Sequence, residues 1–225
     1  MIINKDNIKM DNKFYRIEEI RQLTDETFSL KFSKARFSFK AGQHISISIK
    51  EDKIGREYSI YSSPNDENLE VLVKEVDNGH FTPKLHKLNV GDLVEIHGPY
   101  GNFGIDPKEV EKGKFVFIAS GTGIAPFRSM VRTYPKMDYT LIHGVRLSDE
   151  AYDRHEYSED RYILCSSRDD KGTYNGRLTG YLKCHEFEPE THFYLCGNSD
   201  MIFDALEILR EKGFGRNQIH CEVYF

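Results

Sequence analysis

An arginine and a tyrosine two positions apart have types and a spacing that suit the binding of a nucleotide. Arg56 and Tyr58 lie in the run REYSIYS at 56–62, and on a strand they share one face. A guanidinium can hold a phosphate through two hydrogen bonds, and an aromatic ring can stack on a flat heterocycle. The pair therefore suits a flavin nucleotide. Taken alone, it also fits an ordinary strand with a surface arginine and a half-buried tyrosine.

A second candidate is the turn Gly121-Thr122-Gly123, which follows the apolar run 115–119 and precedes Pro126. Glycines let backbone N–H groups approach a phosphate or a flat ring, and a helix start offers positive potential to a pyrophosphate. Pro126 suits the first turn of a helix, and it stands where the usual Gly-x-Gly-x-x-Gly pattern has its third glycine. The turn fits a tight strand-to-helix connection equally well.

These residues lie within two regions of different periodicity. The first hundred residues alternate apolar and polar side chains in short runs, most clearly at 44–49. Alternation of this kind predicts strands. The expected strands are 15–20, 27–32, 43–49, 57–61, 69–76 and 93–97. Several antiparallel strands of this length suggest a small barrel.

From residue 115 onward, apolar runs alternate with helical patterns, which predicts a parallel, doubly wound sheet. The expected strands are 115–119, 139–143, 162–165 and 192–196. A helix is expected over 201–212, capped by Ser199 or Asp200 and ended by Gly213. A short helix is expected to open at Asp106-Pro107. We divide the chain into two domains, 1–106 and 107–225.

Composition narrows the class of protein. The chain has 225 residues, 39% of them hydrophobic and 30% charged, which excludes collagen-like and wholly disordered classes. The longest apolar run, 115–119, is far too short to cross a bilayer. A net charge of -5 gives no general reason to bind nucleic acid or anionic lipid. The first residues lack the apolar core of a signal peptide, so we expect a cytoplasmic protein. Its widely spaced cysteines predict free thiols and no metal site.

Five motifs, in this order and spacing, resemble those of the ferredoxin-NADP reductase family, and the resemblance covers nearly the whole chain. The motifs are Arg56-x-Tyr58-Ser59-x-x-Ser62, Gly79-x-x-Thr82, Gly98-Pro99-Tyr100-Gly101, Gly121-Thr122-Gly123-x-x-Pro126 and Cys196-Gly197. The resemblance implies an antiparallel Greek-key β-barrel that binds FAD, followed by an α/β domain with a doubly wound parallel sheet that binds NADP. This agrees with the change of periodicity.

The resemblance also implies roles for individual residues. Arg56 would hold the FAD pyrophosphate, Tyr58 would stack on the isoalloxazine, and Ser59 would lie near the flavin nitrogen that accepts hydride. Thr122 would approach the nicotinamide, and Cys196 would border the site of hydride transfer, shaping it more than attacking as a nucleophile. Cys196 could instead be a small buried hydrophobe. The implied contacts to FAD and nicotinamide are Arg56, Tyr58, Ser59, Ser62, Gly79, Thr82, Thr122, Tyr224 and Phe225.

Nucleotide choice depends on the residues that follow the strand 162–165. By resemblance, the 2′-phosphate of NADP would be held at Ser167-Arg168 and Arg177, with Arg146 as a further candidate. Asp169-Asp170 complicates this assignment, because a carboxylate that accepts from ribose hydroxyls favours NAD. We expect NADPH over NADH. The residues assigned to NADP are Gly121, Gly123, Arg146, Ser167, Arg168 and Arg177.

The sequence ends Glu222-Val223-Tyr224-Phe225. By resemblance, an aromatic ring here would shield the flavin until nicotinamide displaces it; a last strand with apolar ends explains the same residues. Glu222 could relay protons near the flavin, or it could be an exposed acid on an edge strand. The catalytic candidates are Ser59, Cys196 and Glu222.

The expected activity is hydride transfer from NADPH to FAD, followed by passage of single electrons to a separate carrier, ferredoxin or flavodoxin. Lys34, Arg36 and Lys40 could receive an acidic carrier, although such a charge run is usually a solvated face. One alternative is an NAD(P)H-dependent reductase of free flavin or small oxidants. Another is an electron-transfer subunit of a larger complex. We expect a monomer.

Overall fold

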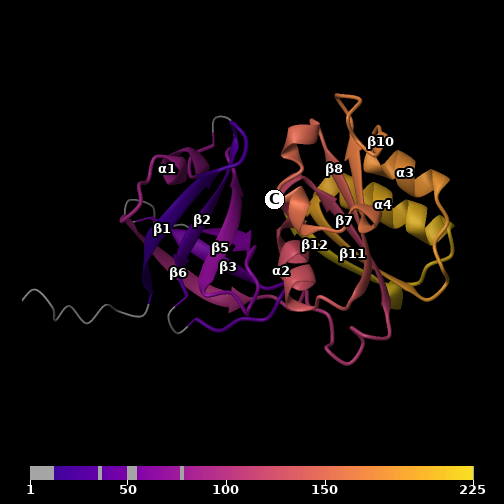
Figure 1. Cartoon of the computed structure of the whole chain (residues 1–225), viewed down its shortest axis with the longest axis horizontal. Helices are drawn as coiled ribbons and strands as arrows, with labels where there is room; N and C mark the ends of the chain where they lie inside the picture. The colour runs from indigo at the N-terminus through magenta and orange to yellow at the C-terminus, as the bar shows by residue number, and fades with distance from the viewer. Residues whose placement is uncertain (1–12, 35–36, 50–54, 77–78, 225) are drawn as a thin grey trace, which may run out of the picture.

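Two sheets lie side by side in the computed structural model (Figure 1), which describes residues 13–34, 37–49, 55–76 and 79–224. The strands of the first sheet are β1 (Phe14–Gln22), β2 (Thr27–Ser33), β3 (His44–Ser48), β4 (Arg56–Ser59), β5 (Asn68–Lys74) and β6 (Leu93–Tyr100). The strands of the second are β7 (Lys114–Ser120), β8 (Asp138–Val145), β9 (Tyr162–Ser166), β10 (Tyr174–Asn175), β11 (Thr191–Asn198) and β12 (Ile219–Tyr224). The helices are α1 (Thr82–His86), α2 (Ala125–Thr133), α3 (Leu178–Cys184) and α4 (Ser199–Glu211).

The first sheet is antiparallel, in the order β4-β3-β6-β1-β2-β5. A bridge between Ile60, just after β4, and Val71 of β5 joins the two end strands and closes the sheet into a barrel. The alternation of β3 explains its place, since Ile45 and Ile47 are fully buried in the barrel core while Ser46 faces outward. The expected antiparallel Greek-key barrel is confirmed.

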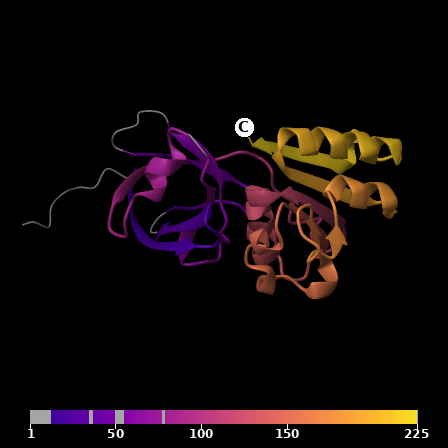
Figure 2. The same cartoon turned by 90° about the horizontal axis from the view of Figure 1, so that it is seen from above.

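The second sheet is parallel, in the order β10-β9-β8-β7-β11-β12. Helices cover both of its faces: α2 packs on one side, and α3 and α4 pack on the other (Figure 2). Each face has its own core, because Phe117 and Phe127 meet on the α2 side while Ile118 and Leu209 lie on the other. The expected doubly wound α/β fold is confirmed.

Helix boundaries differ from the sequence-based predictions in two places. Helix α4 begins at Ser199, and its cap is Asn198, whose Oδ1 accepts from the backbone N–H groups of Asp200 (3.0 Å) and Met201 (3.3 Å). Asp106-Pro107 opens a series of turns instead of a helix. The Asp106 carbonyl accepts from the Glu109 N–H at 2.9 Å, and no amphipathic stripe follows to extend this turn.

An ion-pair cluster joins the two halves of the molecule. We call it the interdomain cluster; its members are Arg21, Tyr61 and Glu70 from the barrel, and Arg128, Asp153 and Glu156 from the α/β domain. Arg21 donates to both carboxylate oxygens of Asp153, at 2.6 and 2.7 Å, and the Tyr61 hydroxyl donates to the same carboxylate at 2.8 Å. Burial alone would raise the pKa of Asp153, but the hydrogen bonds from Arg21 and Tyr61 outweigh it and lower that pKa to about 2.

Arg128 of α2 occupies the centre of the interdomain cluster. Its guanidinium donates to both oxygens of Glu156, each at 2.7 Å, to Glu70 at 3.2 Å and to the backbone carbonyl of Tyr61 at 3.1 Å. It also lies 4.1 Å from the centre of the Tyr61 ring. Its side chain is only 7% exposed. Buried charges of this kind are tolerated only with paired partners, so the cluster fixes how the two domains meet.

Candidate active site

Arg56 and Tyr58 lie on β4, at the edge of the barrel sheet, where they pair with Ile47 and Ile45 of β3. The Tyr58 ring packs against the barrel core, while its hydroxyl is buried without a hydrogen-bond partner among the described residues. The Arg56 guanidinium is exposed; it donates to the adjacent Gly55 carbonyl and lies 6.0 Å from the Phe81 ring. The arginine therefore reaches the start of α1.

The turn before α1 leaves no room for a side chain at Gly79. A Cβ there would lie 2.8 Å from the Val76 carbonyl oxygen, which the Gly79 N–H already contacts at 2.8 Å. The Thr82 hydroxyl accepts from the Val76 N–H at 2.9 Å and so holds the two ends of the turn together. Because Phe81 lies beneath Arg56, the turn and the guanidinium border the same region of the surface.

Ser62 is engaged elsewhere. It is buried in the barrel wall, where its hydroxyl accepts from the Glu70 N–H at 2.9 Å. The structure thus places Ser62 beside the interdomain cluster, whereas Arg56, Tyr58, Gly79 and Thr82 border the start of α1. Its role as a cofactor contact stays a prediction.

These residues fit a flavin dinucleotide. The exposed guanidinium of Arg56 has N–H donors to spare for a phosphate. The buried Tyr58 hydroxyl lacks the partner that such groups usually have, and an adjacent ligand would supply one.

Ser59 and Glu222 bring the barrel and the second sheet into direct contact. The Ser59 hydroxyl, from the end of β4, donates to Glu222 Oε2 on β12 at 2.9 Å. In the same region, Glu222 pairs in register with Cys196 of β11. Burial raises the pKa of Glu222, and the hydrogen bond from Ser59 opposes that rise only in part. Glu222 therefore holds a proton more readily than an exposed glutamate does. The three catalytic candidates thus lie together.

Cys196 is fully buried, and burial raises the pKa of its thiol well above the usual range. A protonated, enclosed thiol is a poor nucleophile, so its chemistry suits shaping the site. The Tyr224 hydroxyl interacts with both Ser59 and Cys196. The Tyr224 hydroxyl therefore lies beside two of the catalytic candidates. Phe225 lies outside the described residues.

The Gly-Thr-Gly turn packs directly against the Cys196 strand. Residues Gly121–Ile124 form a 3-10 turn that leads into α2. A Cβ on Gly123 would lie 2.3 Å from the Cys196 carbonyl oxygen, and one on Gly197 would lie 2.3 Å from the Ser120 hydroxyl. Only glycines allow these two turns to approach so closely. Thr122, between Gly121 and Gly123, is half-buried. Its approach to the nicotinamide stays a prediction.

His143 supports this turn from below, a role that sequence reasoning missed. Its ring is fully buried, with Nε2 at 2.8 Å from the Gly121 carbonyl and Nδ1 at 2.6 Å from the Tyr162 hydroxyl. A carbonyl only accepts, so Nε2 carries the proton and Tyr162 donates to Nδ1. Burial lowers the pKa of His143 to about 4. A neutral imidazole therefore fixes Gly121, whose φ of +52° is positive.

Four of the residues assigned to NADP, Arg146, Ser167, Arg168 and Arg177, follow the carboxyl ends of β8, β9 and β10, whereas Gly121 and Gly123 follow β7. The Arg168 N–H donates to the Arg146 carbonyl at 2.8 Å, which brings these two segments together. Arg177 follows β10 and is the residue directly before α3, with no capping hydrogen bond from its side chain. The side chains of Ser167 and all three arginines are exposed. Carboxyl ends of parallel strands are where such sheets bind ligands.

Asp169, which complicated the choice of nucleotide, has a structural task. One carboxylate oxygen accepts from the Ser148 N–H at 2.8 Å and the other from the Lys171 N–H at 3.3 Å. These bonds, with the Ser148 bond the strongest influence, lower the pKa of Asp169 to about 2. The carboxylate thus ties the turn after β9 to the turn after β8.

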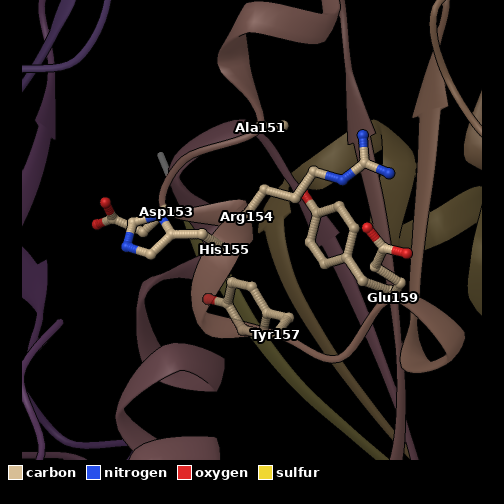
Figure 3. Close-up of a pocket in the computed structure, with 7 residues that line it drawn as sticks. Ala151, Asp153, Arg154, His155, Tyr157 and Glu159 are labelled. Atoms are coloured by element: carbon tan, nitrogen blue, oxygen red, sulfur yellow. The ribbon is translucent and has the colours of Figure 1, made fainter.

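The segment between β8 and β9 contributes to the interdomain cluster and carries a cavity of about 680 Å³ (Figure 3). In Figure 3 the Asp153 carboxylate points toward the barrel, while the Arg154 side chain points away from it. The cavity is lined by Ala151, Asp153, Arg154, His155, Tyr157, Glu159 and Tyr162. It includes none of the residues that the sequence singled out.

Comparison with known families agrees with this geometry. Residues 15–105 match the family model described as an oxidoreductase FAD-binding domain, and residues 117–207 match the oxidoreductase NAD-binding domain. The chain belongs to the ferredoxin-NADP reductase family of FAD-dependent oxidoreductases. Within its described part, no helix has the length and apolar character of a membrane span. The same residues contain no cluster of three or more potential metal-binding side chains.

Individual relatives share the fold over nearly the full chain. Ferredoxin--NADP reductase B of Sorangium cellulosum is 28% identical, with 93% of this chain and 96% of the relative covered. The ferredoxin NADP+ reductase of Neisseria gonorrhoeae, solved with bound FAD and NADP, has a TM-score of 0.84 at 27% identity. The match covers 96% of this chain and the whole of the Neisseria chain. The Amycolatopsis cytochrome P450 reductase has a TM-score of 0.85 at 25% identity. The match covers 94% of this chain and 69% of the reductase.

Proposed function

We propose that this protein takes hydride from NADPH onto bound FAD and passes electrons singly to a separate carrier, ferredoxin or flavodoxin. The observation that carries the proposal is the 2.9 Å contact between Ser59 of the barrel and Glu222 of the second sheet. Glu222 pairs in register with Cys196, against which Gly123 packs. Three of the residues that the resemblance assigns to the site of hydride transfer, Ser59, Cys196 and Glu222, thereby lie together. The FAD domain would comprise residues 1–106 and the NADP domain residues 107–225.

Each half has a separate task in this proposal. Arg56, Gly79 and Thr82 would bind the FAD diphosphate, and the Tyr58 ring would orient the flavin. When bound, the flavin supplies the conversion of a two-electron donor into single electrons. The protein's part is to align the two cofactors and to exclude water. Tyr224 would serve the second purpose, because its hydroxyl lies beside Ser59 and Cys196.

NADPH is favoured over NADH by the charges around the carboxyl ends of β8 to β10. Arg146, Arg168 and Arg177 expose guanidinium groups without carboxylate partners among the described residues, and a phosphate dianion needs such donors. Asp169, which directly follows Arg168 in the sequence, is held by the backbone of Ser148. An ordered, engaged carboxylate is poorly placed to accept from a ribose hydroxyl.

The identity of the electron carrier is proposed mainly from the names of the relatives, because the basic residues expected to contact it give little support. The Sorangium relative, named a ferredoxin--NADP reductase, matches this chain over almost its whole length. Lys34, one of the expected carrier contacts, donates to the backbone carbonyls of Pro64 and Asp66 instead. Arg36 lies outside the described residues, and Lys40 is exposed.

The decisive measurement is the visible absorbance of the purified protein with and without NADPH, followed by stopped-flow mixing with ferredoxin or flavodoxin. We expect a yellow protein that bleaches rapidly with NADPH and regains colour as the carrier is reduced. Bleaching without carrier reduction would instead indicate a reductase of free flavin or small oxidants. Negligible bleaching would indicate an electron-transfer subunit, and a colourless protein that does not take up FAD would refute flavin binding altogether.

A further inference from the structure

A histidine lies between the buried Ser59–Glu222 pair and the protein surface. His44, the first residue of β3, has Nδ1 at 3.4 Å from Glu222 Oε1 and Nε2 at 3.9 Å from Glu57 Oε2. The exposed fraction of the side chains falls from 73% at Glu57 to 19% at His44 and 17% at Glu222. Ser59, at the inner end, is buried. Four groups able to carry protons thus run from solvent to the proposed flavin site.

The backbone keeps the middle of this series open. Gly101 passes beside the imidazole with φ of +87°, and a Cβ there would lie 2.9 Å from His44 Nδ1 and 3.7 Å from Glu222 Oε1. A side chain at this position would press on His44 where it faces the carboxylate. Gln43 holds the loop in place, because its Nε2 donates to the Gly101 carbonyl at 3.2 Å.

We propose that Ser59, Glu222, His44 and Glu57 form a proton path between the flavin site and solvent, with His44 as the link. Imidazole suits that position because one ring nitrogen can take up a proton while the other releases one. Each nitrogen of His44 faces a different carboxylate. The inference rests on the proposed function, since it assigns a task to residues beside the bound cofactor.

The path has a defined proton balance. Hydride brings one hydrogen with two electrons, and once the electrons have left singly that hydrogen must reach solvent as a proton. Ser59 Oγ takes up a proton and gives its own to Glu222 Oε2, the direction in which it already donates. In its protonated form Glu222 carries its proton on Oε1, facing His44 Nδ1. As Oε2 gains the proton from Ser59, Oε1 gives its own to Nδ1, and Nε2 releases one to Glu57 and water. Rotation of the carboxyl group then returns the remaining proton to Oε1. No electrons move along the path, and exchange with water restores the first tautomer of His44.

The surroundings of His44 are compatible with this task. The charged groups that face it are Glu57 of β4 and Glu222 of β12, and the titratable ring of Tyr100 on β6 lies 6.0 Å away. When His44 is protonated it stabilises the Glu222 carboxylate, because its charge and its hydrogen bond both lower the Glu222 pKa that burial raises. Loss of the imidazole should therefore raise the pKa of Glu222 further.

The test compares His44→Phe with a matched control, His97→Phe. His97 lies on β6 of the same barrel and pairs with Glu95 at 2.9 Å, so the control removes a similar histidine-glutamate contact away from Glu222. A first measurement follows the Glu222 carboxyl by carbon-13 NMR as a function of pH. We expect His44→Phe to raise the Glu222 pKa by about one unit and His97→Phe to leave it unchanged.

A second measurement follows reoxidation of the reduced holoenzyme by ferricyanide in stopped flow, in H2O and in D2O. Removing His44 should slow reoxidation about tenfold or more and increase the solvent isotope effect. Added imidazole should restore the rate in His44→Ala but not change it in the wild type. A purely structural role would give no rescue by imidazole.

Three results would overturn the proposal: an unmoved Glu222 pKa in His44→Phe, wild-type reoxidation in the same variant, or loss of bound FAD without rescue by imidazole. The proposed function fails separately. If the wild type takes no hydride from NADPH, the reductase assignment is wrong, while the NMR titration still decides whether His44 is coupled to Glu222.

Discussion

Replacing Arg128 by methionine should destabilise the protein more than any comparable change at the domain boundary. Methionine has a similar length but no charge, so the substitution removes every hydrogen bond that the guanidinium makes to Glu70, Glu156 and the Tyr61 carbonyl. Glu70 would remain buried with one contact to Arg21 at 3.3 Å and one to the Ser29 hydroxyl at 2.7 Å.

The magnitude follows from the exposure of the partners. Arg128 and Glu70 are each only 7% exposed at the side chain, and removing one partner of a buried ion pair costs about 3–5 kcal/mol. We add no separate energy for the lost contact between Arg128 and the Tyr61 ring, because the energies of neighbouring interactions are not additive. For a protein of this size, the melting temperature should fall by about 6–20 °C.

Thermal and urea unfolding, followed by circular dichroism, measure this loss. Arg132→Met is the control, because Arg132 lies one turn further along α2 and contacts Asp66 and Glu156, but its side chain is 36% exposed. An exposed pair contributes about 0–1 kcal/mol. If the free energy of unfolding falls equally in the two variants, burial is not what makes the Arg128 contacts strong, and the prediction is wrong.

Three further outcomes are expected. Arg168→Ala should raise KM for NADPH about tenfold or more while leaving KM for NADH nearly unchanged; equal changes in steady-state assays would refute the phosphate assignment. Asp153 has a pKa lowered to about 2, so the stability it contributes, roughly 2 kcal/mol, is present above about pH 4 and is lost as pH falls through 2. Asp153→Asn should therefore flatten the acid limb of a plot of urea midpoint against pH, and an unchanged limb would assign that loss elsewhere. Gly123→Ala should cost more than about 2 kcal/mol and weaken nucleotide binding measured by calorimetry, because its methyl group would meet the Cys196 carbonyl at 2.3 Å; wild-type affinity and stability would show that the turn can shift.

Periodicity in the sequence predicted most of the fold. The alternation at 44–49 indicated a strand with one buried face, and the structure buries Ile45 and Ile47 as that pattern requires. Helix α3 was not predicted, because its seven residues include a glycine and carry only two fully buried side chains, Leu178 and Leu182. The cap of α4 fell on Asn198, one residue before the candidates chosen, since local sequence leaves several residues able to cap.

The candidate site was less accessible to sequence reasoning. Ser59 and Glu222 were named by resemblance, and no spacing rule places them 2.9 Å apart. His143 and Arg128 were missed, although each left a signal: a histidine inside an apolar strand and an arginine among the apolar residues that open α2. Such residues need buried partners, but the partners come from distant segments that only the fold brings close.

The interdomain cluster limits how this enzyme can be recombined with its relatives. Its basic and acidic members are divided between the halves, with Arg21 and Glu70 on one and Arg128, Asp153 and Glu156 on the other. A chimera that takes only one half from this chain inherits buried charges whose counterparts were left behind, and each unmatched charge is costly in a dry interior. A functional hybrid therefore requires that the residues of the interdomain cluster be transferred together from both domains.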